Sequence, residues 1–480
     1  MQIYKNTSNE VDKAKRKQAK FPDAKNFREL AFLVLYEVYA LDAFSDISLD
    51  RNLNKSNLDT SEKSTATAYV YSTLSKTLAL DELISKLSKT PIKKLDKTVL
   101  VILRLGLWQI YFSNAKDHAA VSETVKLCQR FGVSSARSLV NAILRNAIRK
   151  IPVDDYQPES IYAQTGFNED LYKLFLDELG SEAEVRKLSE AFDKSLGLNV
   201  RIRSGIDGQA LPKLVLKNIL ESSGVDVNSP SFQTDAFKLN TKGKSLHSID
   251  AWKSGHLLAQ GEGAMLASLA LSPEAGDRVA DLCAAPGGKT WHMNDLSDGE
   301  AQIIANDIHS HRVQLMDNEI ERLELDNIET LNRDAADTAA WNDYSEQFDK
   351  ILLDVPCTGL GLIHSQPELR FTFDSTETAD LLTTQAKILS NADNLLKTGG
   401  YILYASCTLN SAENQKQVQE FIQTHKNYEL VDLNKNLLNV REKLTSFDGR
   451  LNEEISEGMV TLWPQNTMSE GFFIALLKKN

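Results

Sequence analysis

The stretch Asp281-Leu-Cys-Ala-Ala-Pro-Gly-Gly-Lys-Thr290 decides the fold of the C-terminal half of the chain. It follows a short hydrophobic run, Arg278–Leu282, which has the composition of a buried strand. Gly287 and Gly288 let the backbone approach a cofactor closely at the start of a helix. In an open parallel sheet, ligands bind in the crevice outside the carboxyl ends of the strands. We therefore expect a ligand site at the end of this strand.

Strand and helix signals alternate on both sides of this loop. The helical stretches His309–Leu323 and Ser375–Leu396 lie between hydrophobic runs of strand length. This alternation predicts a doubly wound α/β sheet. The predicted strands are Arg278–Leu282, Gln302–Asp307, Ile328–Asn332, Lys350–Val355, Tyr401–Ser406 and Phe472–Leu477.

Two acidic residues at strand ends indicate which cofactor the loop binds. Asp307 ends the second predicted strand, at about the 20-residue distance where a carboxylate binds ribose hydroxyls. Asp334 follows the third predicted strand, where it can bond an adenine edge. A nucleoside-triphosphate loop is disfavoured, because Cys283 stands where that motif requires its first glycine. An adenosine cofactor without a triphosphate fits, either S-adenosylmethionine or a dinucleotide.

Two cysteines follow the next two predicted strands. Cys357 lies in Asp354-Val-Pro-Cys and Cys407 in Ala405-Ser-Cys-Thr. If these strands are neighbours, their axes are about 4.8 Å apart and both thiols reach one ligand. Methylation of a pyrimidine carbon requires a nucleophile at C6, and a thiolate is suited to that addition. The four cysteines show no metal-ligand spacing, so no metal site is predicted.

Charge is distributed unevenly along the 480 residues, whose net charge is −12. Residues 1–150 hold 25 Lys and Arg against 15 Asp and Glu, and the remainder is strongly acidic. This pattern favours contact of the N-terminal part with a polyanion, the alternative being a merely lysine-rich helical domain. The longest apolar run, Val99–Phe112, is too short to span a bilayer, and no signal sequence is evident. We expect a cytoplasmic protein with reduced thiols and no membrane partner.

The N-terminal part has helical periodicity. Val99–Phe112 is apolar nearly all round and predicts a buried central helix. Ser134 or Ser135 is predicted to cap a helix on which Arg137, Arg145 and Arg149 share one side. These arginines form either a solvated face or a phosphate-binding face. A further basic run contains Lys13, Lys15, Arg16, Lys17 and Lys20, either a solvated arm or a binding site.

The motifs Asp281–Thr290, Asp354–Gly359, Ala405–Leu409 and Gly471–Ala475 resemble those of the RNA cytosine-5 methyltransferases of the Nop2/Sun type. The N-terminal part is similar to the NusB-like domain of one bacterial branch, which methylates a cytosine of small-subunit ribosomal RNA. The resemblance implies an all-α NusB-like domain (1–152), a small α+β module (153–250) and an α/β Rossmann-like class I methyltransferase domain (251–480). The segments similar to NusB are Leu80–Ile84, Lys94–Asp96, Ile102–Gly106, His118–Val121 and Val140–Arg145.

The resemblance also implies roles for individual residues. Cys407 would be the nucleophile that adds to C6, and Cys357 would help to resolve the covalent adduct. Asp354 would bond the N3/N4 edge of the cytosine. A monomeric enzyme acting on small-subunit ribosomal RNA is expected. S-adenosylmethionine would be held by Cys283, Ala284, Ala285, Pro286, Gly287, Gly288, Lys289, Asp307, Asp334 and Asp354.

The chain departs from the family pattern at two places. His364-Ser365-Gln366 stands where the family has Arg-Arg-His, and Gly261 stands where an acidic residue commonly follows Gln260. These changes affect the expected RNA or cofactor affinity, not the thiols. Two other functions remain open: methylation of transfer RNA, and RNA binding by a catalytically silent assembly or antitermination factor.

Overall fold

The chain forms two compact units in the computed structural model, which describes residues 21–113, 116–194, 196–203, 211–242 and 244–480. The basic run from Lys13 to Lys20 lies outside the described residues. The helical unit comprises the described residues up to Lys194 together with Ile363–Ser375. The sheet unit comprises Ser195–Leu362 and Thr376–Asn480. The predicted domain boundaries at residues 152 and 250 remain predictions. The first division between the two units falls after Lys194.

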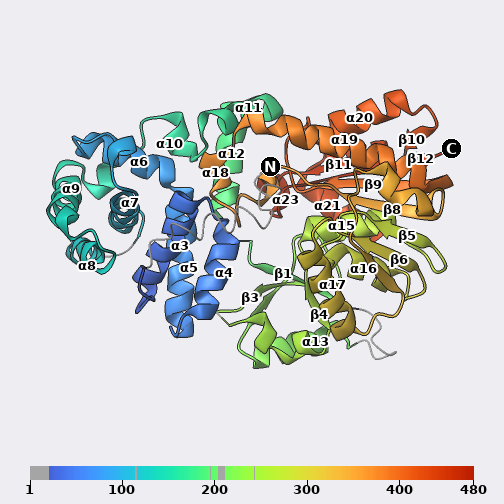
Figure 1. The fold of residues 1–480 in the computed structure, drawn as a ribbon, viewed down its shortest axis with the longest axis horizontal. Coiled ribbons are helices and arrows are strands. Elements are labelled where there is room, and N and C mark those ends of the chain that lie inside the picture. Colours follow the sequence, from blue (N-terminus) through green and yellow to red (C-terminus); the bar gives the residue numbers. More distant parts are fainter. Residues whose placement is uncertain (1–20, 114–115, 195, 204–210, 243) are drawn as a thin grey trace. The chain divides into compact units, whose positions relative to one another are not determined.

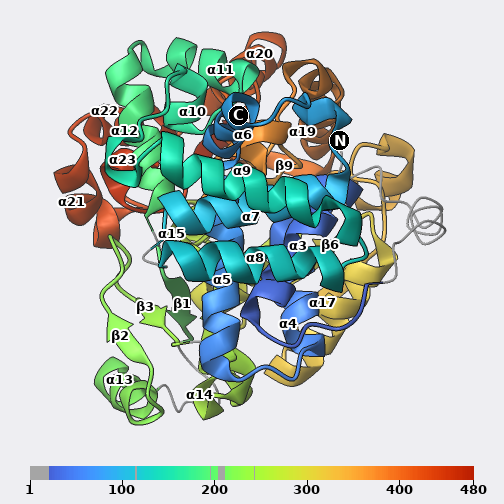
Figure 2. The same ribbon diagram turned by 90° about the vertical axis from the view of Figure 1, so that its left-hand side faces the viewer.

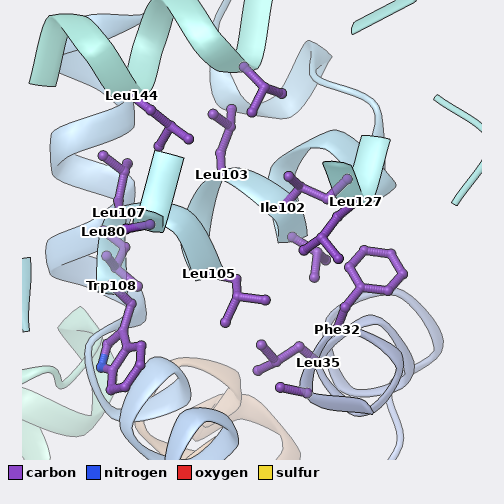
Figure 3. Packing of buried hydrophobic residues seen from close by; sticks show 14 of the residues in the cluster. Phe32, Leu35, Leu80, Ile102, Leu103, Leu105, Leu107, Trp108, Leu127 and Leu144 are labelled. Atoms are coloured by element: carbon purple, nitrogen blue, oxygen red, sulfur yellow. The ribbon is translucent and has the colours of Figure 1, made fainter. Parts of the chain in front are cut away.

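Helix α7 (Lys97–Tyr111) is the buried centre of the helical unit, as its all-round apolar sequence predicts. Leu103 and Leu107 on one face of the helix and Leu105 on the opposite side are all fully buried. Figure 3 shows them beside Phe32 of α3 (Phe27–Leu41) and Leu144 of α9 (Arg137–Lys150). Figure 2 shows α7 running between α8 and α9. The other helices here are α4 (Ser45–Lys55), α5 (Thr60–Ser75), α6 (Thr77–Leu87), α8 (Asp117–Arg130), α10 (Ile161–Thr165), α11 (Glu169–Leu179), α12 (Glu182–Asp193) and α18 (Leu369–Thr372).

The predicted serine cap of α9 is wrong. Ser134 and Ser135 lie in a short 3₁₀ turn, Ser134–Ala136, and the cap position is Ala136, which has no side-chain oxygen. The turn already supplies helical geometry ahead of α9, so no side-chain cap is needed there. Arg137, Arg145 and Arg149 are exposed. Arg145 donates to Oδ1 of Asn141, one turn earlier, at 3.0 Å.

A segment distant in sequence completes the helical unit. Ile363–Ser375, here called the strap, belongs to this unit although sheet-unit sequence precedes and follows it. Glu368 of the strap accepts the backbone N–H of Ser45 at 2.8 Å. Arg370 is 1% exposed and donates to the carbonyl of Thr165 at 2.8 Å. The strap is therefore anchored by buried charged groups.

A small antiparallel sheet with the order β2-β3-β1-β4 opens the sheet unit. Its strands are β1 (Leu198–Ile202), β2 (Asp226–Asn228), β3 (Ala236–Asn240) and β4 (Leu257–Ala259), and α13 (Lys213–Ser222) accompanies them. Leu216 and Leu220 of α13 pack with Val200 and Phe237 of the sheet. This confirms the α+β character expected of the middle of the chain.

The large sheet has the order β10-β12-β9-β8-β5-β6-β7, with β11 paired to β12. Strands β5 to β9 run parallel, and β12 is antiparallel to its neighbours. The six predicted strands are all present, and the doubly wound α/β fold is confirmed. The strands are β5 (Arg278–Asp281), β6 (Gln302–Asn306), β7 (Ile328–Leu331), β8 (Phe348–Asp354), β9 (Leu396–Ser406), β10 (Tyr428–Leu430), β11 (Met459–Leu462) and β12 (Phe472–Lys479).

Helices cover both faces of the large sheet, as Figure 1 shows. On one face, α15 (Glu262–Leu271), α16 (Gly288–Leu296) and α21 (Leu438–Phe447) contribute to one hydrophobic cluster with the strands. On the other, α19 (Thr378–Leu395) and α20 (Gln415–Thr424) contribute to a second. Because both faces of the sheet are buried, side chains on both sides of its strands are apolar, and the strand sequences read as continuous apolar runs. The remaining helices are α14 (Asp250–Lys253), α17 (Ser310–Leu323), α22 (Leu451–Glu457) and α23 (Pro464–Thr467). Among the described residues, no helix has the length and apolar content needed to cross a membrane.

Candidate active site

The loop after β5 turns sharply into helix α16. Gly287 has φ +103°, and a Cβ there would lie 2.1 Å from the Trp291 ring, so only glycine fits. The N–H of Gly287 donates to the carbonyl of Ala284 at 2.8 Å, and Ala284 in turn is held by the carbonyl of Asn306. The turn therefore leads directly from the loop after β5 into α16, which begins at Gly288.

Asp281, which sequence reasoning did not select, ends β5 beneath this loop. It is 1% exposed, and its Oδ2 accepts the Thr290 hydroxyl at 2.7 Å. Its Oδ1 is buried without a hydrogen-bond partner among the described residues. Burial raises the pKa of Asp281 to about 7. A buried acceptor without a donor is costly, and a ligand that brings a donor to this oxygen would remove that cost.

The two other predicted acids lie at the ends of β6 and β7. Asp307 is 5% exposed and accepts the N–H of His309 at 2.8 Å. Asp334 is exposed and accepts the N–H of Ala336 at 2.8 Å. Burial raises the pKa of Cys283 well above its ordinary value, and the carboxylates of Asp281 and Asp307 raise it further. The cofactor loop is therefore surrounded by negative charge.

The two thiols meet at the ends of adjacent strands. Asp354 of β8 pairs with Ala405 of β9 in parallel register, which confirms that the strands are neighbours. The Sγ atoms of Cys357 and Cys407 are 3.4 Å apart, and both cysteines are free. Cys357 is buried, whereas Cys407 is partly exposed. One small ligand can therefore touch both sulfurs.

A close backbone crossing fixes the loops that hold the thiols. The N–H of Gly361 donates to the carbonyl of Cys407 at 2.9 Å, and the N–H of Gly471 donates to the carbonyl of Gly361 at 3.0 Å. A Cβ on Gly361 would lie 2.0 Å from the Gly471 oxygen. Glycine is required at position 361 because three backbone segments meet there.

Lys289 links the cofactor loop to the thiol loops. Its Nζ lies 2.6 Å from Oδ2 of Asp354 and 5.4 Å from the centre of the Phe472 ring. Burial lowers the pKa of Lys289, but the Asp354 carboxylate and, to a smaller extent, Cys407 outweigh burial and raise it. The cation therefore persists beside a partly exposed sulfur and a carboxylate.

The predicted residues fall into two groups on this edge. Asp307 and Asp334 follow β6 and β7 on one side of β5, and the cysteines follow β8 and β9 on the other. The cofactor loop and Lys289 lie between them, because β5 is the strand shared by both groups. This is the strand where the order of the sheet reverses direction, which is where open α/β sheets bind ligands.

Sequence reasoning missed Glu413, which is fully buried six residues after Cys407. It accepts hydrogen bonds from Thr358, the residue that follows Cys357, and from Gln385 of α19. The only signal in the sequence is an acidic residue in a polar turn, which is ordinary. Its partners lie 28 and 55 positions away, so no local pattern reveals the contact.

The structure shows the surroundings of both departures from the family pattern. A Cβ at Gly261 would lie 2.0 Å from Oε1 of Glu470, whose carboxylate accepts the N–H of Gly263. An acid is thus present at this position, but it comes from another part of the chain. His364 to Gln366 lie in the strap, where Gln366 donates to Asp46 at 3.3 Å.

Comparisons with known proteins agree with this geometry. Residues 268–478 match the family model described as 16S rRNA methyltransferase RsmB/F, and residues 25–149 match the NusB family. The chain is 30% identical over 457 residues to a probable ribosomal RNA small subunit methyltransferase B of Synechocystis, covering 94% of this chain and 99% of that protein. A Bacillus subtilis protein with the same name is 29% identical, covering 94% and 98%.

Two solved structures share the fold. The crystal structure of PH0851 has a TM-score of 0.77 at 22% identity, covering 95% of this chain and 99% of that one. The structure of NSun6 from Pyrococcus horikoshii with SFG has a TM-score of 0.54 at 19% identity, covering 65% and 98%. Taken with the sequence relatives and the arrangement of the site, these matches show that the chain belongs to the RsmB/F family of 16S rRNA methyltransferases and has a NusB-family domain at its N-terminal end.

Proposed function

We propose that this methyltransferase transfers a methyl group from S-adenosylmethionine to C5 of a cytosine in small-subunit ribosomal RNA. The observation that supports this reaction most strongly is the pair of free thiols 3.4 Å apart at neighbouring strand ends. Methylation of an amino group needs no covalent nucleophile, whereas methylation of a pyrimidine carbon does. The ribosomal target is supported by the names of the relatives.

The residues around the cofactor loop fit S-adenosylmethionine. The unpartnered Oδ1 of Asp281 is suited to the ammonium group, and the surrounding carboxylates are suited to a molecule with a positive sulfonium. We assign Asp307 to the ribose hydroxyls and Asp334 to the adenine edge, with residues 283–289 as the cradle. When bound, the cofactor supplies the methyl group that C5 receives.

Cys407 is assigned as the nucleophile. It is the more exposed of the two thiols, and the Lys289 ammonium interacts with it. Addition of the thiolate to C6 forms a carbon–sulfur bond and moves electron density to C5, which becomes nucleophilic. Asp354 is assigned to hydrogen-bond the N3/N4 edge of the base during this attack. After C5 is methylated, water accepts the C5 proton, the electron pair of that C–H bond re-forms the C5–C6 double bond, and the carbon–sulfur bond breaks to restore the Cys407 thiolate.

Cys357 is assigned to resolution of the adduct. The contact with Cys407, burial and the carboxylate of Glu413 raise the pKa of Cys357 well above its ordinary value, so it stays protonated. A protonated thiol beside the carbon–sulfur bond assists release rather than attack. The target base must leave its stack to reach these sulfurs.

Substitution of each cysteine tests the assignment. Cys407→Ala should abolish transfer of labelled methyl groups to RNA, and Cys357→Ala should accumulate a protein band covalently linked to RNA. Cys128→Ala is the matched control, because Cys128 is a free cysteine of the helical unit. Full turnover by Cys407→Ala would falsify the mechanism.

Bisulfite sequencing of RNA from a deletion strain tests the target. Loss of one 5-methylcytosine from small-subunit ribosomal RNA is expected. Loss from transfer RNA instead would contradict the ribosomal assignment and leave the chemistry intact. RNA binding without any methyl incorporation would identify a catalytically silent assembly factor.

A further inference from the structure

Glu413 contacts the loops of both cysteines from a fully buried position. Its Oε2 accepts the backbone N–H of Thr358 at 2.9 Å and Nε2 of Gln385 at 3.1 Å. Its Oε1 accepts the Thr358 hydroxyl at 2.6 Å and Nδ2 of Asn410 at 3.1 Å. An ionised carboxylate has about four acceptor positions, and these donors fill them. The surroundings of Glu413 are therefore arranged for a negative charge.

The same network reaches the residue after Cys407. Thr358 follows Cys357 and Thr408 follows Cys407, and their hydroxyl oxygens are 2.7 Å apart. Because Thr358 gives its single hydroxyl proton to Glu413, the Thr408 hydroxyl is the donor in this contact. Oγ1 of Thr408 also lies 3.4 Å from Oε1 of Glu413. One carboxylate thus fixes the residues next to both sulfurs.

We infer that Glu413 is a positioning residue, which holds the two cysteine loops together and keeps a negative charge beside Cys357 so that Cys407 alone is the reactive thiol. The inference deepens the proposed function and rests on it for the meaning of the two roles. Its physical basis, a difference in reactivity between the thiols, is measurable without RNA or cofactor.

The charged groups beside the two cysteines have opposite signs. The Glu413 carboxylate adds to the contact with Cys407 and to burial in raising the pKa of Cys357. On the other side of the pair, the interaction with Cys407 contributes to raising the pKa of Lys289, so an ammonium lies near Cys407. Only the thiolate is a nucleophile, so this arrangement separates an attacking sulfur from a proton-holding sulfur. The two cysteines therefore differ both in burial and in the charged groups beside them.

Glu413→Gln tests the inference by removing the charge while nearly preserving the shape. Full-length protein is alkylated with iodoacetamide at several pH values between about pH 7 and pH 10, and each cysteine is quantified by peptide mass spectrometry. Below the pKa of Cys357, we expect the Cys357-to-Cys407 labelling ratio to rise about threefold for each unit by which that pKa falls, because the roughly tenfold gain in thiolate is partly offset by its lower nucleophilicity. An unchanged ratio in folded Glu413→Gln protein overturns the inference.

Glu262→Gln is the matched control. Glu262 is also fully buried and accepts three backbone N–H groups, from Ser231, Phe232 and Gln233, but it contacts neither cysteine loop. It should leave the labelling ratio at the wild-type value, and a rise equal to that of Glu413→Gln would also overturn the inference.

Thr358 supplies a second test that does not depend on Glu413→Gln being folded. Thr358→Val removes the hydroxyl that joins the two loops and should raise the ratio, and Thr358→Ser should restore it. Equal ratios in the two variants would contradict the inference. A shifted ratio in a protein whose wild type methylates no RNA would refute the proposed function alone.

Discussion

Replacing Arg370 of the strap by Met should destabilise the whole helical unit. Arg370 is 1% exposed, and its guanidinium donates to Asp193 at 2.7 Å, to the Thr165 carbonyl at 2.8 Å and to the Ser189 carbonyl at 3.3 Å. Methionine fills a similar volume but supplies no donor. The Thr165 carbonyl then keeps the Ser189 hydroxyl at 2.6 Å, the Ser189 carbonyl loses its Arg370 donor, and Asp193 keeps its exposed contact with Lys76.

The size of the destabilisation follows from the groups that lose Arg370 as their partner. Breaking one partner of a buried ion pair costs about 3–5 kcal/mol. Asp193 is 30% exposed, so solvent screens part of its loss and the lower end of that range applies. For a unit of this size, about 3 kcal/mol lowers the melting temperature by roughly 6–12 °C.

Hydrogen exchange followed by peptide mass spectrometry is the assay, because it reports the helical unit and the sheet unit separately. Arg186→Ala is the control: Arg186 lies in the same unit but is 40% exposed, and its pair with Glu182 should contribute less than about 1 kcal/mol. Protection in α10 and α12 should fall in Arg370→Met and not in Arg186→Ala. If the loss is confined to the strap itself, or equals that of the control, the strap is not an integral part of the unit.

Two further perturbations test the site. Gly361→Ala forces a Cβ within 2.0 Å of the Gly471 oxygen and 2.8 Å of the Cys407 oxygen. It should lower the free energy of unfolding measured in urea by about 1–3 kcal/mol and abolish methyl transfer. Gly449→Ala, with no atom within 4 Å of the added Cβ, should do neither. Asp281 has a folded-state pKa raised to about 7 by burial, so the folded protein holds this proton and the stability contributed by the group is lost as pH rises from about 4 through 7. In Asp281→Asn that contribution is absent, and urea unfolding between about pH 5.5 and pH 8 should show a smaller decrease in stability than in wild type; equal slopes would show that the carboxyl is not buried.

The parts of the structure that local sequence determines could be predicted from the sequence. The carboxyl ends of β5, β8 and β9 were located because each strand is a continuous apolar run followed by Gly, Pro or Cys, and parallel strands buried on both faces have that composition. Once those ends were known, the meeting of Cys357 with Cys407 required only that β8 and β9 be neighbours, which they are.

The parts that depend on distant pairing could not be predicted. Strands β10 and β11 have only three and four residues and are held by β12, so no periodicity identifies them. The strap has no sequence feature that assigns it to helices more than 200 positions earlier; its place is set by buried hydrogen bonds of Glu368 and Arg370. Glu413 is another case, since its donors Thr358 and Gln385 become its neighbours only when the loops fold together.

Strand β5 explains why a cofactor loop and a pair of thiols meet on this edge. With β6 on one side and β8 on the other, the loop after β5 lies beside the strand ends of both groups. Helix α16 begins in that loop, and its second residue, Lys289, bonds Asp354 at the end of β8 at 2.6 Å. A displacement of the loop therefore moves Lys289, the partner of Asp354. Asp354 itself lies three residues before Cys357. The strand order of the sheet, and not sequence proximity, couples the part of the site assigned to the cofactor to the part assigned to the base.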